Sequence, residues 1–181
     1  PLGAVFISQP TLLKVGNEKA EVSHSDNPIC FSDVYFRVGG ANYKGKVKNC
    51  VTINSNDVIG DNFWVWRADH GDNVGWDMNT APNGIVINGD NVTMYGLFVE
   101  HFQEYQTIWN GNGGKLYFYQ SEMPYDAPNQ KYYMSHNGKV KGYASFKIGD
   151  EVNDFYGCGL GIYCYNRDAN IEIFSGAEIP N

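Results

Sequence analysis

The sequence has 181 residues, of which 43% are hydrophobic, 15% aromatic and 18% charged. This length and composition fit one folded domain with a core and exclude an intrinsically disordered chain. The net charge of −7 disfavours nucleic acid and anionic membranes as partners, because both require a basic surface. No apolar run approaches the roughly 20 residues of a membrane-spanning helix.

Short runs of β-forming residues follow one another along the chain, and helical periodicity is almost absent. Clusters of Asn, Gly and Asp separate these runs and are typical of turns. The chain is therefore expected to be all-β. The expected strands lie at residues 3–8, 33–38, 50–54, 62–67, 84–88, 92–100, 115–120, 143–148, 159–165 and 171–174.

One segment repeats along the chain. The stretches INGDNVTMYGLFVEHF from Ile87 and WNGNGGKLYFYQSEMP from Trp109 both open on a large apolar residue and Asn-Gly, and both reach a Glu thirteen residues later. A third copy starts at Ile53 and ends at Asp69 if about three residues are inserted, and a degenerate fourth starts at Lys147. The 22-residue interval between the first two stretches suits one coil of a right-handed parallel β-helix. A β-sandwich with Asn-Gly hairpins is the alternative fold.

The repeat suggests a role for two glutamates. In a β-helix, Glu100 and Glu122 would occupy equivalent positions on neighbouring coils, with backbones about 4.8 Å apart, and Asp69 could extend the same column. Repulsion would keep a proton on one carboxyl to higher pH. A glycosidase needs such an acid to protonate the leaving oxygen. Alternatively, one Glu faces solvent and the other pairs with Lys115 or Arg67.

The same segment resembles glycoside hydrolase family 55, the β-1,3-glucanases built from two right-handed parallel β-helices. The matching stretches are GLFVEH (96–101), YQ (105–106) and YFYQSEMPYDAPN (117–129). Two further stretches, NFWVWRADHG and VGWDMNTAPNGIVINGDN, are similar to stretches of proteins related to this family. The resemblance implies that Glu122 is the general acid and Glu100 the second acidic residue of the site. It also implies that Tyr125 contacts substrate, with Gln120 as a polar neighbour. Members of the family are several times longer, so this chain is expected to be a single β-helix domain of a larger two-helix protein.

The stretch WRADHGDNVGWD (66–77) combines indoles with carboxylates and suits a sugar-binding cleft. Indole rings of Trp66 and Trp76 would stack on sugar faces, and Asp69 and Asp77 would bind hydroxyls. Either aspartate is also a candidate for the base or water-holding group, because stacked glutamates cannot flank a sugar from opposite sides. The alternatives are a solvated turn with buried indoles, or a structural Ca²⁺ site. His101 is expected to point away from Glu100, because side chains alternate along a strand, and to be a core or hydrogen-bonded histidine.

The four cysteines lack a C-x-x-C motif, so no zinc site is expected. Two disulfides, Cys30–Cys50 and Cys158–Cys164, are the preferred arrangement, and four buried free thiols are the alternative. A glycosylation sequon at Asn91, together with the cysteines, indicates a secreted protein.

The most consistent hypothesis is a glycoside hydrolase that acts on a β-glucan or another neutral polysaccharide without a cofactor. The expected partners are a polysaccharide or oligosaccharide and the remainder of a larger β-helix protein. A non-catalytic carbohydrate-binding or structural module, or a polysaccharide lyase, are the alternatives.

Overall fold

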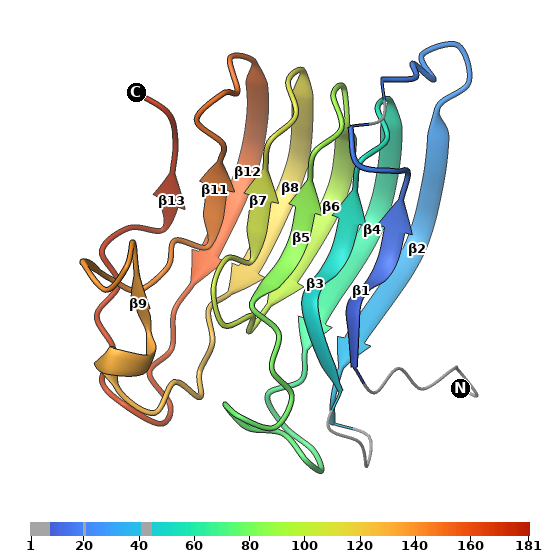
Figure 1. Cartoon of the computed structure of the whole chain (residues 1–181). Coiled ribbons are helices and arrows are strands. Elements are labelled where there is room, and N and C mark those ends of the chain that lie inside the picture. The colour runs from blue at the N-terminus through green and yellow to red at the C-terminus, as the bar shows by residue number, and fades with distance from the viewer. Residues whose placement is uncertain (1–7, 20, 41–44) are drawn as a thin grey trace.

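Two parallel β-sheets face each other in the computed structural model, which describes residues 8–19, 21–40 and 45–181 (Figure 1). One sheet has six strands in the order β1 (Ser8–Val15), β3 (Lys46–Ile53), β5 (Asn83–Ile87), β7 (Thr107–Trp109), β11 (Phe146–Ile148) and β13 (Ala177–Glu178). The other has five strands in the order β2 (Ile29–Val38), β4 (Val58–Arg67), β6 (Thr93–Glu100), β8 (Gly114–Glu122) and β12 (Phe155–Tyr163).

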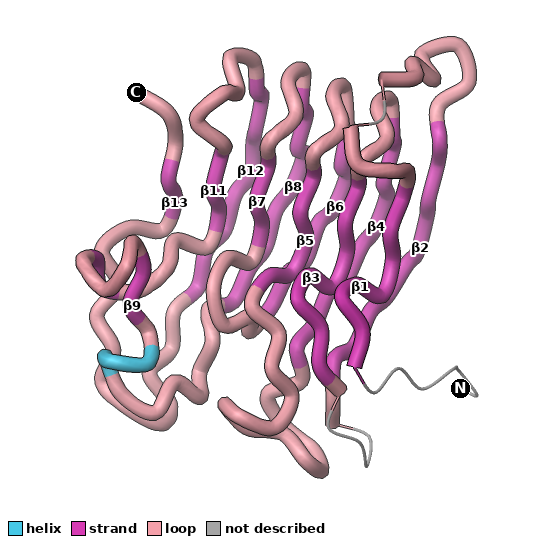
Figure 2. The backbone as a smooth tube through the Cα atoms, viewed as in Figure 1, coloured by secondary structure: helices cyan, strands magenta, loops and turns pink. Residues whose placement is uncertain are grey.

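The chain passes from one sheet to the other and back, so consecutive strands belong to different sheets over most of its length. Every strand pair within the two large sheets is parallel. The all-β prediction with parallel strands is therefore confirmed, and the sandwich of hairpins is wrong for these sheets. Helical structure among the described residues is confined to a 3₁₀ turn, η1 (Gln130–Tyr132) (Figure 2). In this part of the chain no helix has the length and apolarity to cross a membrane.

The predicted repeat appears as a ladder of asparagines where the chain leaves the six-stranded sheet. Asn88 donates its side-chain amide to Asn54 at 2.8 Å, and Asn110 donates to Asn88 at 2.8 Å. The glycine that follows each of the last two asparagines permits close stacking of the turns. A Cβ on Gly111 would lie only 1.8 Å from the carbonyl oxygen of Gly89, so any side chain there would collide with backbone.

A second shared feature bends the strands of the five-stranded sheet. One residue in each strand has a left-handed backbone, with φ between 54° and 70°, and these residues lie opposite one another in the register: Asp33, Asn62, Gly96, Phe118 and Gly159. The bend places two consecutive residues on the outer face, as at Asp61 and Asn62. The inward-facing pattern then resumes one residue out of step, which a simple alternation of apolar residues would not predict.

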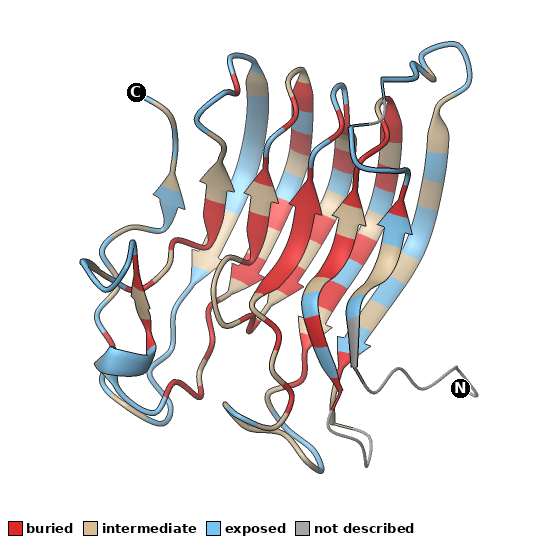
Figure 3. Cartoon of the chain, in the orientation of Figure 1, coloured by how far each residue is buried: buried red, intermediate tan, exposed pale blue. Residues whose placement is uncertain are grey.

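The core lies between the two sheets (Figure 3). Valine, isoleucine, leucine and aromatic side chains fill it, with Phe63, Leu97 and Tyr119 following one another across the five-stranded sheet. The outer face of that sheet carries exposed aromatic rings instead, including Tyr35, Trp64 and Phe118.

Several local predictions need correction. The predicted strand at 3–8 lies outside the described residues except for Ser8, and residues 171–174 form no strand. Asn-Gly at 88–89 and 110–111 lies at crossings between sheets, because the next strand joins the opposite sheet. Only Asn-Gly at 137–138 lies in a hairpin, between β9 (Met134–Ser135) and β10 (Val140–Lys141).

The predicted disulfides are absent, and all four cysteines are free. Cys50 is buried in the core, whereas Cys30 is exposed in the opposite sheet. Cys158 and Cys164 are both exposed, and the extended segment between them can span up to about 20 Å. A disulfide requires Cα atoms within roughly 7 Å. Four buried thiols are equally wrong, because only Cys50 is buried.

Candidate active site

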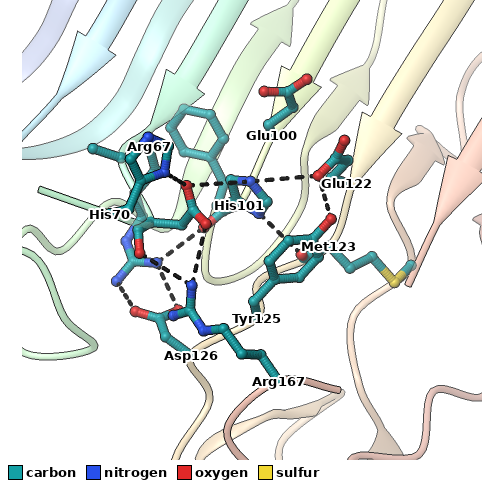
Figure 4. Close-up of polar contacts among 12 residues, drawn as sticks. Arg67, His70, Glu100, His101, Glu122, Met123, Tyr125, Asp126 and Arg167 are labelled. Atoms are coloured by element: carbon teal, nitrogen blue, oxygen red, sulfur yellow. Dashed lines mark hydrogen bonds and ion pairs between the residues drawn. The ribbon is translucent and has the colours of Figure 1, made fainter. Parts of the chain in front are cut away.

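Two carboxylates stack at the C-terminal ends of neighbouring strands. Glu100 ends β6 and Glu122 ends β8, and the two residues are paired in the parallel register. Both side chains are partly exposed on the outer face of the five-stranded sheet. Figure 4 shows the Glu122 carboxyl joined by dashed lines to Tyr125 and His101. The stacking predicted from the 22-residue repeat is therefore confirmed.

Asp69 does not extend this column, contrary to the prediction. Trp66 is the residue paired with Glu100, and Arg37 is paired with Trp66. Thirteen residues counted from Ile53 lead directly to Trp66 without an insertion. The longer spacing of this copy, 34 residues instead of 22, is absorbed after the strand, in the loop that contains Asp69.

His101 joins Asp69 to the glutamates. Its Nε2 lies 3.6 Å from Glu122 Oε2 and 3.7 Å from Asp69 Oδ1, and its Nδ1 lies 3.2 Å from the carbonyl oxygen of Met123. Alternation along β6 predicted the opposite direction for this side chain. His101 is buried and hydrogen-bonded, as expected, but it has a left-handed backbone, with φ of 66°, directly after the strand ends, and its Nε2 also faces Glu122 and Asp69.

Two neutral side chains donate hydrogen bonds to Glu122. The hydroxyl of Tyr125 donates to Oε2 in a short hydrogen bond, and the amide of Gln120 donates to Oε1 at 3.2 Å. The Tyr125 ring also packs edge-on against His101, with centroids 4.4 Å apart. The predicted residues Glu100, Glu122, Tyr125 and Gln120 thus form one cluster.

The electrostatics of the cluster follow from burial and neighbouring charge. Burial raises the pKa of Glu100, and the negative charges of Glu122 and Asp69 raise it further, although the Trp64 indole donates to its Oε2 at 2.8 Å. Burial lowers the pKa of His101, with partial compensation from Asp69. Burial acts to raise the pKa of Asp69, but the two histidines beside it outweigh that effect and lower it. Burial and the hydrogen bond to Glu122 raise the pKa of Tyr125.

A buried arginine holds the surrounding loops together. Arg67, the last residue of β4, has no exposed surface and forms a two-pronged ion pair with Asp126, with N–O distances of 2.9 and 2.8 Å. Its remaining donors bind the carbonyl oxygens of Asn79, Gly75 and His101. This arrangement ties the loop after β4 and the segment after β8 to the backbone of His101.

The cluster opens into a groove of about 520 Å³. Its lining residues include two indoles, both acids of the stacked pair and the groups around His101: Arg37, Trp64, Trp66, Asp69, His70, Glu100, His101, Glu122 and Tyr125. Trp64 and Trp66 are stacked, with centroids 5.5 Å apart. The groove therefore presents flat apolar rings beside carboxylates.

Trp76 and Asp77 do not line the groove. Trp76 packs edge-on against the buried Tyr133 and lies against Arg67, and Asp77 is exposed. Within the described residues, no three His, Cys, Asp or Glu side chains are grouped so that they could hold a metal ion.

Besides His70, which lies in the predicted sugar-binding stretch 66–77, four residues around the groove were not predicted to act there. Trp64 and Arg37 could have been found by counting the register back from Glu100, since Arg37 stands two coils before it. Arg167 has no such signal, because it is 98 residues from Asp69, which its Nη1 contacts at 3.2 Å. The direction of the His101 side chain depends on the left-handed backbone described above, so it could not be found from the alternation of the strand.

Comparison with known proteins relates this chain to an exo-beta-1,3-glucanase. The family model described as the LAM55 pectate lyase-like domain matches residues 2–122. An exo-beta-1,3-glucanase from Streptomyces sp. (strain SirexAA-E / ActE) is 46% identical over 175 residues, which are 96% of this chain and 28% of that protein.

Solved structures give the same relationship. The structure of sacteLam55A from Streptomyces sp. SirexAA-E superposes with a TM-score of 0.92 at 44% identity, over 98% of this chain and 32% of that one. A variant of sacteLam55A in complex with glucose superposes with a TM-score of 0.90 at 42% identity, over the same shares. The chain thus spans about a third of the length of these relatives. The resemblance to glycoside hydrolase family 55 is confirmed, and the chain belongs to the family of LAM55 pectate lyase-like domains.

Proposed function

We propose that this chain carries the catalytic acid of a glycoside hydrolase that cleaves β-1,3-glucan. The observation that carries the proposal is the register pairing of Glu100 with Glu122 inside a groove lined by Trp64 and Trp66. Carboxylic acids beside flat aromatic rings match the needs of a neutral sugar chain. The relative called exo-beta-1,3-glucanase supports β-1,3-glucan as the substrate.

In this proposal Glu122 protonates the oxygen of the leaving sugar. Tyr125 and Gln120 hold its carboxyl in place through the hydrogen bonds to the two oxygens. Gln120 Oε1 is buried and has no hydrogen-bond partner among the described residues, so it can accept a hydrogen bond from a substrate hydroxyl. Glu100 remains protonated to higher pH than an isolated glutamate and so limits the negative charge beside Glu122.

The group that activates water must lie on the other side of the sugar. Glu100 and Glu122 lie on adjacent strands, whose backbones are about 4.8 Å apart. An inverting pair needs roughly 6.5–9.5 Å between carboxyl groups, with the sugar between them. Asp69, which also lines the groove, is the local candidate for the base, and Trp66 is the candidate platform for the sugar ring. Asp77 and Trp76 are less suited to these roles, since neither lines the groove.

The same proposal extends to the whole protein. We propose that the two sheets form a right-handed parallel β-helix, that residues 1–181 are a single β-helix domain of a larger secreted two-helix protein, and that the reaction needs no cofactor. The relatives support the larger size, because this chain covers 28 to 32% of them. Intact-mass measurement of the natural protein tests whether the chain is part of a larger protein.

The test of the activity uses the natural protein and its Glu122→Gln variant with laminarin. The wild type should release reducing ends, and the variant should be slower by about 10²- to 10⁴-fold, the usual contribution of a general acid. Binding of laminarin should be nearly unchanged, because glutamine keeps the size of the side chain and still accepts one of the two hydrogen bonds that Glu122 receives. Glu151→Gln, a change at an exposed turn residue, serves as the matched control.

A Glu100→Gln variant separates the roles of the two acids. It should slow the reaction less than Glu122→Gln, because it leaves Glu122 and its hydrogen bonds from Tyr125 and Gln120 in place. Full activity of Glu122→Gln would refute the assignment of the acid. Laminarin binding by the wild type without release of reducing ends would favour a binding module instead.

A further inference from the structure

Phe118 has a backbone conformation that its side chain does not favour. Its φ is 61°, in the left-handed region, where Cβ crowds the following carbonyl. The equivalent residues on the other strands of the five-stranded sheet are Asp33, Asn62, Gly96 and Gly159, all types that tolerate this region. Phe118 alone carries a bulky side chain there, so the position has a cost in stability.

Packing in the described chain does not explain that cost. The Phe118 side chain is 58% exposed on the outer face of the sheet. Its one aromatic contact is an edge-on contact with Phe98, with centroids 5.7 Å apart. On its other side it lies near Gly159, where a Cβ would be 3.9 Å from Phe118 Cδ2. A strained residue with little burial is more consistent with function than with folding.

The position of Phe118 links it to the candidate active site. Phe98 lines a second groove of about 420 Å³ with Tyr35, Asn62, Trp64 and Glu100. This second groove shares Trp64 and Glu100 with the groove around Glu122. Phe118 contacts Phe98, and Phe98 stands opposite Trp64 in the register, so these three rings follow one another on the outer face and lead away from the carboxylates.

We propose that Phe118 is a distal contact for the glucan chain, where its exposed ring stacks on a sugar unit remote from the bond that is cleaved. The proposal rests on the function proposed above. Phe118 precedes Glu122 by four residues on β8, which places it up to about 13 Å away along the strand. That distance exceeds one sugar ring, so only longer chains reach Phe118. A neutral sugar suits this path, because the rings of Phe118, Phe98 and Trp64 offer flat apolar faces on which a sugar can stack and no cation that would bind an anionic sugar.

The test compares Phe118→Asn with the wild type in the full-length natural protein. Asparagine already occupies the equivalent left-handed position at residue 62. The thermal midpoint should stay the same or rise, because strain is relieved and little packing is lost. KM for laminarin should rise on the order of threefold to tenfold, the range expected for one lost aromatic contact. Turnover of a β-1,3-linked disaccharide should not change. Phe174→Asn, the same substitution at a residue that is 82% exposed outside the sheets, should affect none of these quantities.

Three results would overturn the proposal. An unchanged KM for laminarin with a lower thermal midpoint would show that the ring only shields its glycine neighbours. An unchanged KM and midpoint would show that the ring has no role. Equal loss of activity on laminarin and on the disaccharide would show that the ring packs against another part of the protein.

A binding assay keeps this inference separate from the proposed reaction. If the wild type releases no reducing ends, affinity electrophoresis in laminarin gels still compares the two proteins. Retardation of the wild type that is weaker for Phe118→Asn would support the contact even though the hydrolase assignment had failed. Equal retardation of both proteins would overturn the contact.

Discussion

Replacement of Arg67 by methionine tests how the site is held together. The guanidinium of Arg67 is fully buried and makes five hydrogen bonds, two to Asp126 and three to backbone carbonyl oxygens. Methionine fills much of the space but leaves the carboxylate of Asp126 buried without a partner. Breaking a buried ion pair in this way costs about 3–5 kcal/mol.

This cost should be visible as a change in melting temperature. For a domain of this size, 1 kcal/mol corresponds to roughly 2–4 °C in Tm. Arg67→Met should therefore lower Tm by about 6–20 °C. Tryptophan fluorescence is a suitable probe, because the Trp76 ring lies 5.8 Å from the guanidinium carbon of Arg67. The variant should also lose activity at temperatures where it is still folded, because Arg67 fixes the backbone of His101.

Two further variants test whether the buried ion pair between Arg67 and Asp126 is the source of this stability. Lys141→Met removes a positive charge from an exposed pair with Glu172 and should cost no more than about 1 kcal/mol. The double variant Arg67→Met/Asp126→Leu removes both charges and should recover part of the lost stability, because no unpaired carboxylate remains. If Arg67→Met lowers Tm no more than Lys141→Met does, the buried ion pair does not hold the loops together.

Three more predictions concern the turns, the histidine and the thiols. Gly111→Ala should lower stability far more than Gly138→Ala, because a Cβ on Gly111 would lie 1.8 Å from the Gly89 carbonyl oxygen, whereas a Cβ on Gly138 would meet nothing within 4 Å and has only a left-handed φ of 79° against it; similar melting temperatures for the two variants would contradict the stacking of the turns. The lowered pKa of His101 means that the unfolded chain takes up the proton first, so stability should fall as the pH drops below about 6.5. His101→Gln should reduce the fall in Tm between pH 7 and pH 5.5, and an unchanged fall would show that other groups cause it. Burial raises the pKa of the Cys50 thiol, so this thiol should react with Ellman's reagent only after denaturation, whereas the exposed thiols react in the folded protein: Cys30, Cys158 and Cys164. Rapid reaction of a fourth thiol without denaturant would contradict the position of Cys50.

The sequence alone was sufficient for the part of the site that repeats. Parallel stacking places equivalent residues of successive copies side by side, so a count of 22 residues predicted that Glu100 and Glu122 would pair. The Asn-Gly pairs that open these copies likewise occupy equivalent turns, linked by the ladder from Asn88 to Asn110. Period and composition are local properties, and they can be read without knowledge of the fold.

Only the tertiary structure decided which other groups reach these glutamates. The left-handed backbone at His101 reverses the direction that alternation predicts and brings the imidazole to Glu122. Arg67 and Asp126 are 59 residues apart, and Arg167 and Asp69 are 98 residues apart, so no local pattern marks these pairs. Their contacts depend on how loops of unequal length fold back over the strand ends. The sequence therefore determined the stacked acids, because register follows from the repeat, while the surrounding charges depended on loop conformations that the repeat does not specify.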